Sequence, residues 1–165
     1  MKQWVITFLV FFTVLTCSRE NYGEIVNLEK GKYINTELGV IFNHFPKDVT
    51  LYIIEDKNYG NIELTFVKSG KKLAEFYISR HTSMGDQSYE KGILIDGEYA
   101  SMTEGLEYTN IKLDSDDPVQ LHFQSRKTSL GTICNFYLDR SMVPWVQKNF
   151  KFIRDEEKIK LMENL

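Results

Sequence analysis

Cysteine is scarce in this 165-residue chain, which has only Cys17 and Cys134. An internal disulfide between them requires that the apolar segment before Cys17 stays on the mature protein. If that segment is removed, Cys134 stands alone. A domain of about 150 residues buries enough apolar surface to fold without a disulfide.

Motifs that carry chemistry are absent as well. The sequence has no Gly-x-Ser-x-Gly nucleophile turn and no glycine-rich phosphate loop. The acidic run at 114–117 lacks the glycine of a calcium loop, so we interpret it as a solvated turn. The histidines lie far apart, without a second ligand at metal-motif spacing: His44, His81 and His122. We therefore predict no enzyme activity, no catalytic residue, no metal and no cofactor.

No apolar run is long enough to span a membrane. The longest, Trp4–Leu15, has 12 residues without a charge, whereas a spanning helix needs about 20. Lys2 precedes this run, and small residues at 16–18 follow it. A basic start, a short apolar centre and a small-residue exit are typical of a secretory signal, so we predict that residues 1–17 are a cleavable signal peptide.

The end of this leader, Val14-Leu15-Thr16-Cys17, resembles the lipoprotein box of bacteria. The resemblance implies that Cys17 is acylated and becomes the first mature residue. The protein would then be anchored in a bacterial envelope membrane, on its periplasmic or surface side. The alternative is ordinary cleavage after Ser18, which would release a soluble secreted protein.

Basic residues are outnumbered by acidic residues in this chain. The chain has 20 basic and 23 acidic residues, and a mature protein that begins at Cys17 loses Lys2 and no acid, so its net charge falls from −3 to −4. Nucleic-acid binding needs a basic stripe that displaces counterions. We therefore predict no nucleic-acid partner.

Alternation of apolar and polar residues dominates the remaining sequence, for example at 61–66 and 119–124. A period of two indicates half-buried strands. Strands are expected near 39–43, 49–55, 61–68, 72–79, 92–96, 98–102, 107–113, 119–125 and 130–138. The pattern predicts a mainly β fold, an antiparallel sandwich or barrel of about eight to nine strands.

Several local features refine this prediction. The nearly all-apolar segment 49–54 is expected to be a central strand, covered on both faces. The pairs Ser69-Gly70 and Asp96-Gly97 predict tight hairpins, because their residues tolerate positive φ. The segment 80–91 has no periodicity and is read as a surface loop.

The two ends of the chain differ from its middle. Residues 18–31 are polar and predict a tether, of which 24–28 can enter the sheet as an edge strand. Residues 32–165 are expected to form a single domain. Near the C-terminus, Ser141 is expected to cap a short helix that continues in 155–165. Its apolar side chains should pack on the sheet or close a barrel: Met142, Val143, Trp145, Val146 and Phe150.

Alternation also predicts which face of a strand carries particular residues. Cys134 shares a strand face with Phe136 and Leu138, so we predict a buried, unreactive thiol. His122 lies on the polar face of its strand and is expected in solvent. Tyrosines near loops favour a binding surface: Tyr22, Tyr59, Tyr89 and Tyr99.

These features lead to one functional hypothesis with two rivals. The first is a lipid-anchored binding protein with a protein partner, for example an immunity-type inhibitor of a toxin. The second is a lipid or small-ligand carrier with a lipocalin-like barrel, and the third is a secreted hydrolase.

Overall fold

The computed structural model describes residues 22–28, 31–56, 58–80, 92–104, 110–125, 131–154 and 156–157. Strands make up most of these residues, and a 3-10 turn, η1 (Arg140–Met142), leads into the helix α1 (Val143–Asn149). The strands are β1 (Glu24–Ile25), β2 (Tyr33–Asn35), β3 (Val40–Phe42), β4 (Val49–Asp56), β5 (Asn61–Lys68), β6 (Lys71–Arg80), β7 (Ile93–Ile95), β8 (Glu98–Glu104), β9 (Pro118–Ser125), β10 (Thr132–Asp139) and β11 (Phe150–Phe152).

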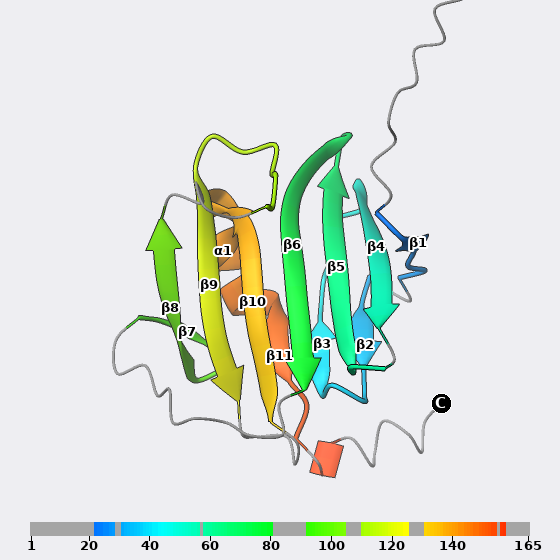
Figure 1. Cartoon of the computed structure of the whole chain (residues 1–165), viewed down its shortest axis with the longest axis vertical. Helices are drawn as coiled ribbons and strands as arrows, with labels where there is room; N and C mark the ends of the chain where they lie inside the picture. Colours follow the sequence, from blue (N-terminus) through cyan, green and yellow to red (C-terminus); the bar gives the residue numbers. More distant parts are fainter. Residues whose placement is uncertain are drawn as a thin grey trace, which may run out of the picture.

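The strands form two antiparallel sheets. The larger has eight strands in the order β1-β4-β5-β6-β10-β9-β8-β7, and the smaller has three in the order β11-β3-β2. The large sheet is open, because its edge strands β1 and β7 do not pair with each other. The prediction of a mainly β, antiparallel fold with a short helix near the C-terminus is confirmed, and the barrel alternative is wrong. Figure 1 shows the small sheet and α1 together behind the large sheet.

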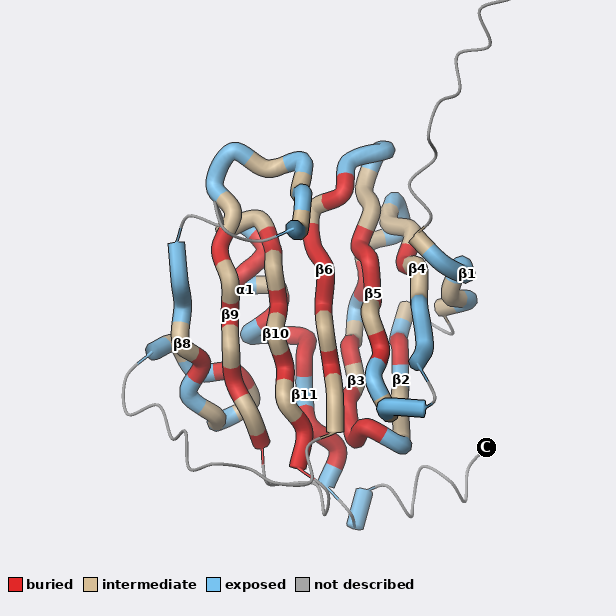
Figure 2. Tube along the Cα trace, viewed as in Figure 1, coloured by how far each residue is buried: buried red, intermediate tan, exposed pale blue. Residues whose placement is uncertain are grey.

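Phenylalanine rings fill the space between these two layers. Phe42 of β3 lies 5.0 Å from the ring of Phe76 on β6 and 5.8 Å from that of Phe136 on β10. Phe150 of β11 lies 5.2 Å from Phe136. All four side chains are fully buried, and buried positions alternate along the central strands (Figure 2). Burial of these rings is the main source of stability, and it covers one face of the large sheet.

The chain after β10 departs from the predicted helix. Asp139, not Ser141, caps the 3-10 turn, and its carboxylate accepts a hydrogen bond from the Ser141 amide. The helix ends at Asn149 because Phe150 is extended and pairs with Phe42 in the small sheet. The expected packing of Trp145 is confirmed, since its ring lies 5.6 Å from that of Phe66 on β5. Most of 155–165 lies outside the described residues.

Two strand predictions are wrong. Segment 49–54 is not covered on both faces: β4 lies one strand from the edge of the large sheet, between β5 and the two-residue β1, and Ile54 is 42% exposed. Residues 110–113 are not a strand, because β8 already occupies the place beside β9. The rest of that predicted strand lies outside the described residues, as does most of the loop at 80–91.

Both predicted tight turns are confirmed. Ser69 and Gly70 have φ of 52° and 76°, and Asp96 and Gly97 have φ of 49° and 82°. Positive φ at both central residues matches the right-handed twist of the flanking strands. The hairpin at Ser69-Gly70 also contains a β-bulge, since the register shifts between Phe66 and Val67.

Candidate functional site

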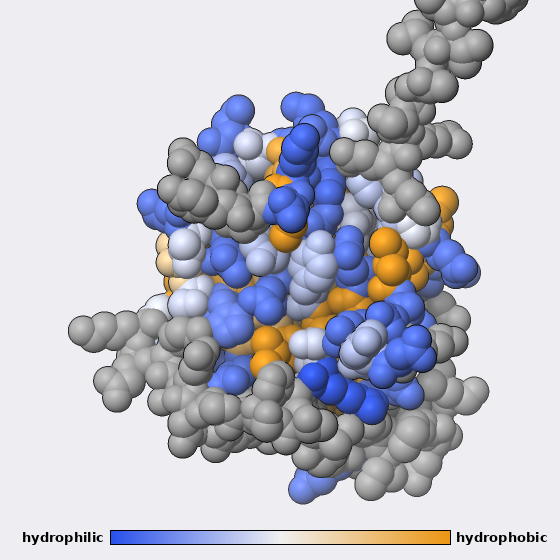
Figure 3. Space-filling view, viewed as in Figure 1, coloured by the Kyte–Doolittle hydropathy of each residue, from blue (hydrophilic) through white to orange (hydrophobic). Residues whose placement is uncertain are grey.

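The large sheet has a second face, turned away from the small sheet and α1, which we call the outer face. Its side chains are mainly polar and aromatic. Figure 3 shows hydrophilic atoms over most of this face, with apolar atoms across its middle. No described helix or strand packs on it as the second layer does on the other face, and Tyr22, ahead of β1, lies against Tyr52 and Lys72 of this face.

A cluster of charged residues lies near the middle of this face, and we call it the Glu63 cluster: Glu63, Lys72, Glu75 and Tyr77. The Lys72 ammonium forms an ion pair with the Glu75 carboxylate, and both side chains are almost completely buried. The β-bulge places Lys72 and Glu75 on the same face, although they are three residues apart along one strand. Tyr77 donates a hydrogen bond of 3.2 Å from its hydroxyl to Glu75 Oε2.

Glu63 is the remaining acid of this cluster. It lies directly across from Tyr77 in the β5–β6 register, and its carboxylate is within hydrogen-bonding reach of the same tyrosine hydroxyl. Burial and the nearby Glu75 carboxylate raise the pKa of Glu63 above its usual range. Burial and both carboxylates likewise raise the pKa of Tyr77, which keeps its hydroxyl protonated.

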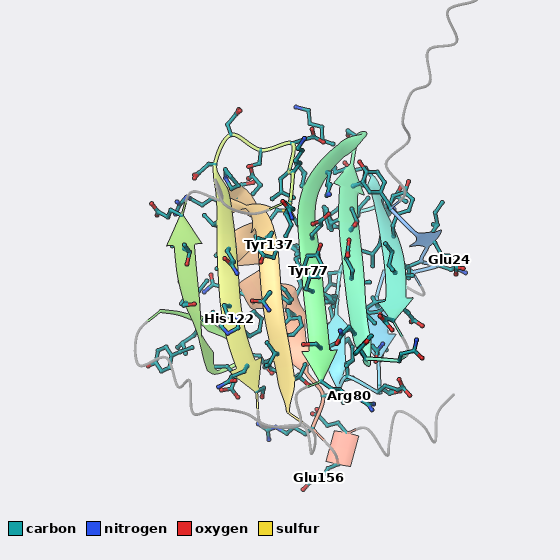
Figure 4. All side chains as sticks on the ribbon, in the orientation of Figure 1. Glu24, Tyr77, Arg80, His122, Tyr137 and Glu156 are labelled. Atoms are coloured by element: carbon teal, nitrogen blue, oxygen red, sulfur yellow. The ribbon has the colours of Figure 1, made fainter. Side chains whose placement is uncertain are left out.

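Further polar pairs extend the surface across β10 and β9. The Tyr137 ring meets that of Tyr77 edge to face at 5.8 Å, and Gln120 Nε2 donates to the Tyr137 hydroxyl at 3.3 Å. His122 Nδ1 lies 2.5 Å from Asn135 Oδ1. Figure 4 shows Tyr77 and Tyr137 side by side in the middle of the sheet, with His122 toward its β8 side. His122 lies on the polar face of its strand as predicted, but it is half-buried beside Asn135 and not in open solvent.

A polar pocket of about 530 Å³ lies at one end of β4, β5 and β6. Arg80 donates from Nη2 to the Glu37 carbonyl oxygen at 2.9 Å. Its buried Nε has no acceptor among the described residues. Glu37, Glu55 and Asp56 also line the pocket, so its lining is charged and of both signs.

The other residues singled out by the sequence are dispersed. Cys134 is a free, fully buried thiol, and burial raises its pKa well above the usual value. Asp114 accepts a hydrogen bond from the Lys72 amide at 2.7 Å, and Asp117 pairs with Arg140 at 2.7 Å. Within the described ranges no three metal-ligating side chains come together. Cys17 and Tyr89 lie outside the described residues.

The sequence reasoning missed the Glu63 cluster. Its members occupy the polar positions of alternating strands, which is the pattern of an ordinary solvated face. The signal that was available is the surplus of tyrosine and glutamate at those positions: Glu63, Glu75, Tyr77 and Tyr137. Their proximity depends on strand order and on the bulge, neither of which is visible in a single sequence.

Comparison with known proteins gives no match. No family model matches the chain, and no curated protein or solved structure matches it. In the part of the chain that the structure describes, no helix is long and apolar enough to cross a membrane.

Proposed function

We propose that this protein is an exported binding protein, held to a bacterial envelope membrane through an acylated Cys17, whose outer sheet face docks a partner protein. The observation that carries the proposal is the asymmetry of the large sheet. One face is packed with phenylalanine rings, and the other presents tyrosine, glutamate, glutamine and histidine side chains. Tyrosine is favoured in protein interfaces because it covers a large area at a low cost in conformational entropy.

The charges of this face support one kind of partner, a basic protein. Carboxylates alternate with inward-facing residues on β4, β5, β6 and β10: Asp56, Glu63, Glu75 and Asp139. On the same outward positions of these strands the basic side chain is Lys72, which is paired with Glu75. The face is therefore acidic and complements a basic protein. An immunity-type role, in which this face covers a basic region of a toxin, is one concrete form of the proposal.

A carrier function receives less support. The lipocalin-like alternative needs a closed barrel with an apolar interior, whereas the large sheet is open and the space between the layers is filled by aromatic rings. The pocket beside Arg80 is lined by acids. It therefore does not suit a lipid.

Site-specific photo-crosslinking tests the docking face. A photoreactive phenylalanine analogue at Tyr137 should give a protein adduct of one mass in the organism that makes the protein. Excess unlabelled protein should compete for that adduct. The same analogue at Lys151, exposed on β11 in the other layer, is the matched control and should give none. Adducts of equal yield at both positions would refute docking through the outer face.

A further inference from the structure

Charge balance in the Glu63 cluster leaves an excess of one negative charge, because Lys72 is set against the two carboxylates of Glu63 and Glu75. Lys72 neutralises Glu75, since their charged groups are in direct contact. In the described part of the chain Glu63 forms no ion pair. The cluster therefore carries a net charge of −1 in a half-buried place, where an unpaired carboxylate is unfavourable.

The hydrogen-bonding capacity of Tyr77 also leaves the Glu63 carboxylate incompletely stabilised. A tyrosine hydroxyl has a single hydrogen to donate, and that of Tyr77 is directed to Glu75. It therefore cannot also donate to Glu63, although the two groups are within reach. The Glu63 carboxylate is stabilised either by taking up a proton, which then bonds to the tyrosine oxygen, or by receiving a cation from outside.

The surroundings of Glu63 suit a cationic side chain better than a bare ion. Ile54, directly across from Glu63 on β4, is 42% exposed, and Tyr77 lies on the opposite side in β6. A lysine or arginine binds with its carbon stem on apolar surface and its charged head on a carboxylate. Glu63 has such apolar surface on both sides.

We infer that Glu63 is the receptor for one arginine or lysine side chain of the docking partner, with Ile54 and Tyr77 in contact with its stem. This inference rests on the proposed docking function and assigns the chemistry of its central contact. The cation and the proton compete for the same carboxylate. Binding therefore strengthens as the pH rises through the range in which Glu63 ionises.

The other charged groups of the face do not take this role. The titratable and charged groups around Glu63 are Tyr22 ahead of β1, Tyr52 on β4, Lys72, Glu75 and Tyr77 on β6, and Tyr137 on β10. Glu75 is 4% exposed and already paired. Burial and the two carboxylates keep the Tyr77 hydroxyl protonated, so Glu63 is the acid of the cluster that remains for a cation.

Nuclear magnetic resonance titration of the full chain tests this inference with a short peptide that contains one arginine. The peptide should shift the amide signals of residues 54, 63 and 77 to saturation. A peptide with citrulline, the uncharged analogue of arginine, should not. Glu63→Gln should weaken binding about tenfold or more, the loss expected for one charge-assisted hydrogen bond. Glu156→Gln, which neutralises an exposed carboxylate that follows β11 and lies outside the outer face, should leave the affinity within about twofold.

The wild-type protein supplies a measurement that does not depend on any variant. Its affinity for the arginine peptide should fall as the pH is lowered from neutral to about 4, near the ordinary pKa of glutamate. Equal binding by wild type and Glu63→Gln, or binding that does not change with pH, would overturn the assignment. The two proposals fail separately. A Tyr137 crosslink that persists without arginine binding removes the cation site, whereas arginine binding without a crosslink removes the docking partner.

Discussion

Cys134 shows how alternation along a strand decides the environment of one residue. It is opposite Phe123 on β9 and Ile78 on β6, and all three side chains lie in the core. A thiol in such a place behaves as a small apolar group and is protected from reagents. The neighbours Ile133 and Asn135 point to the outer face and are half-buried.

Substitution of Cys134 tests this placement. Cys134→Ser should lower the free energy of unfolding by about 1–3 kcal/mol, because the hydroxyl enters an apolar site without an assured partner. Cys134→Ala should cost about 1 kcal/mol, since it leaves only a small void. Urea denaturation measures both, and iodoacetamide should label the wild-type thiol only after unfolding. Rapid labelling of the native protein would contradict a buried position.

Glu63 gives a stability prediction that needs no ligand. Its pKa is raised in the folded protein, so folded chains hold more protons than unfolded chains at a pH just above the ordinary glutamate value. Unfolding then becomes easier as the pH rises through that range. Glu63→Gln should therefore stabilise the protein at neutral pH, and the gain should shrink toward pH 4 and below. Thermal unfolding of both proteins across this range is the measurement. A gain that is constant with pH would show that titration of Glu63 is not its cause.

At the scale of elements, the hairpin between β7 and β8 shows how a local turn is joined to a distant strand. Asp96 occupies the left-handed region that the tight turn requires. Its carboxylate also accepts a hydrogen bond of 3.0 Å from the Phe152 amide on β11. This residue therefore links the edge of the large sheet to the small sheet behind it.

Two substitutions at Asp96 separate the turn from the link. Asp96→Ala should lower the free energy of unfolding by about 1–3 kcal/mol, because it strains the turn and leaves the Phe152 amide without its acceptor. Asp96→Asn should cost clearly less, since asparagine tolerates positive φ and keeps an acceptor oxygen. Chemical denaturation compares the two, and equal losses would mean that the link contributes nothing measurable.

At the scale of the whole molecule, the two faces of the large sheet differ in their side chains. The phenylalanine core holds the small sheet and α1 against one face of the large sheet. The other face carries the Glu63 cluster and the tyrosines. In our proposal the segment before β1 is the tether to the membrane, and β1 itself lies at the edge of the large sheet.

Location of the whole protein depends on Cys17 in our proposal. Acylation there should place the wild type in the membrane fraction, because several acyl chains anchor a protein stably where one does not. Cys17→Ser should move the protein to the soluble fraction or leave an unprocessed precursor. Fractionation with mass spectrometry of the mature N-terminus measures this. A mature chain that begins at Arg19, with unchanged fractionation, would refute the lipid anchor.

The sequence by itself determined the features that depend on near neighbours. Alternation along 61–68, 119–125 and 132–138 decides which side chains are buried, because successive residues in a strand point to opposite faces. The turns at Ser69-Gly70 and Asp96-Gly97 follow from the positive φ that their residues tolerate. These local rules predicted the mainly antiparallel β fold.

The tertiary structure alone decided what depends on strand order. The same alternation of residues can produce an open sheet or a closed barrel. The two architectures differ only in whether the distant edge strands pair with each other. Phe150 is extended and not helical because it pairs with Phe42, more than a hundred residues earlier. The Glu63 cluster likewise forms because β5 and β6 are adjacent and a bulge turns Lys72 and Glu75 to the same side. Each of these features depends on contacts between segments that are distant in the sequence. The local pattern of residues does not show which of these segments become neighbours.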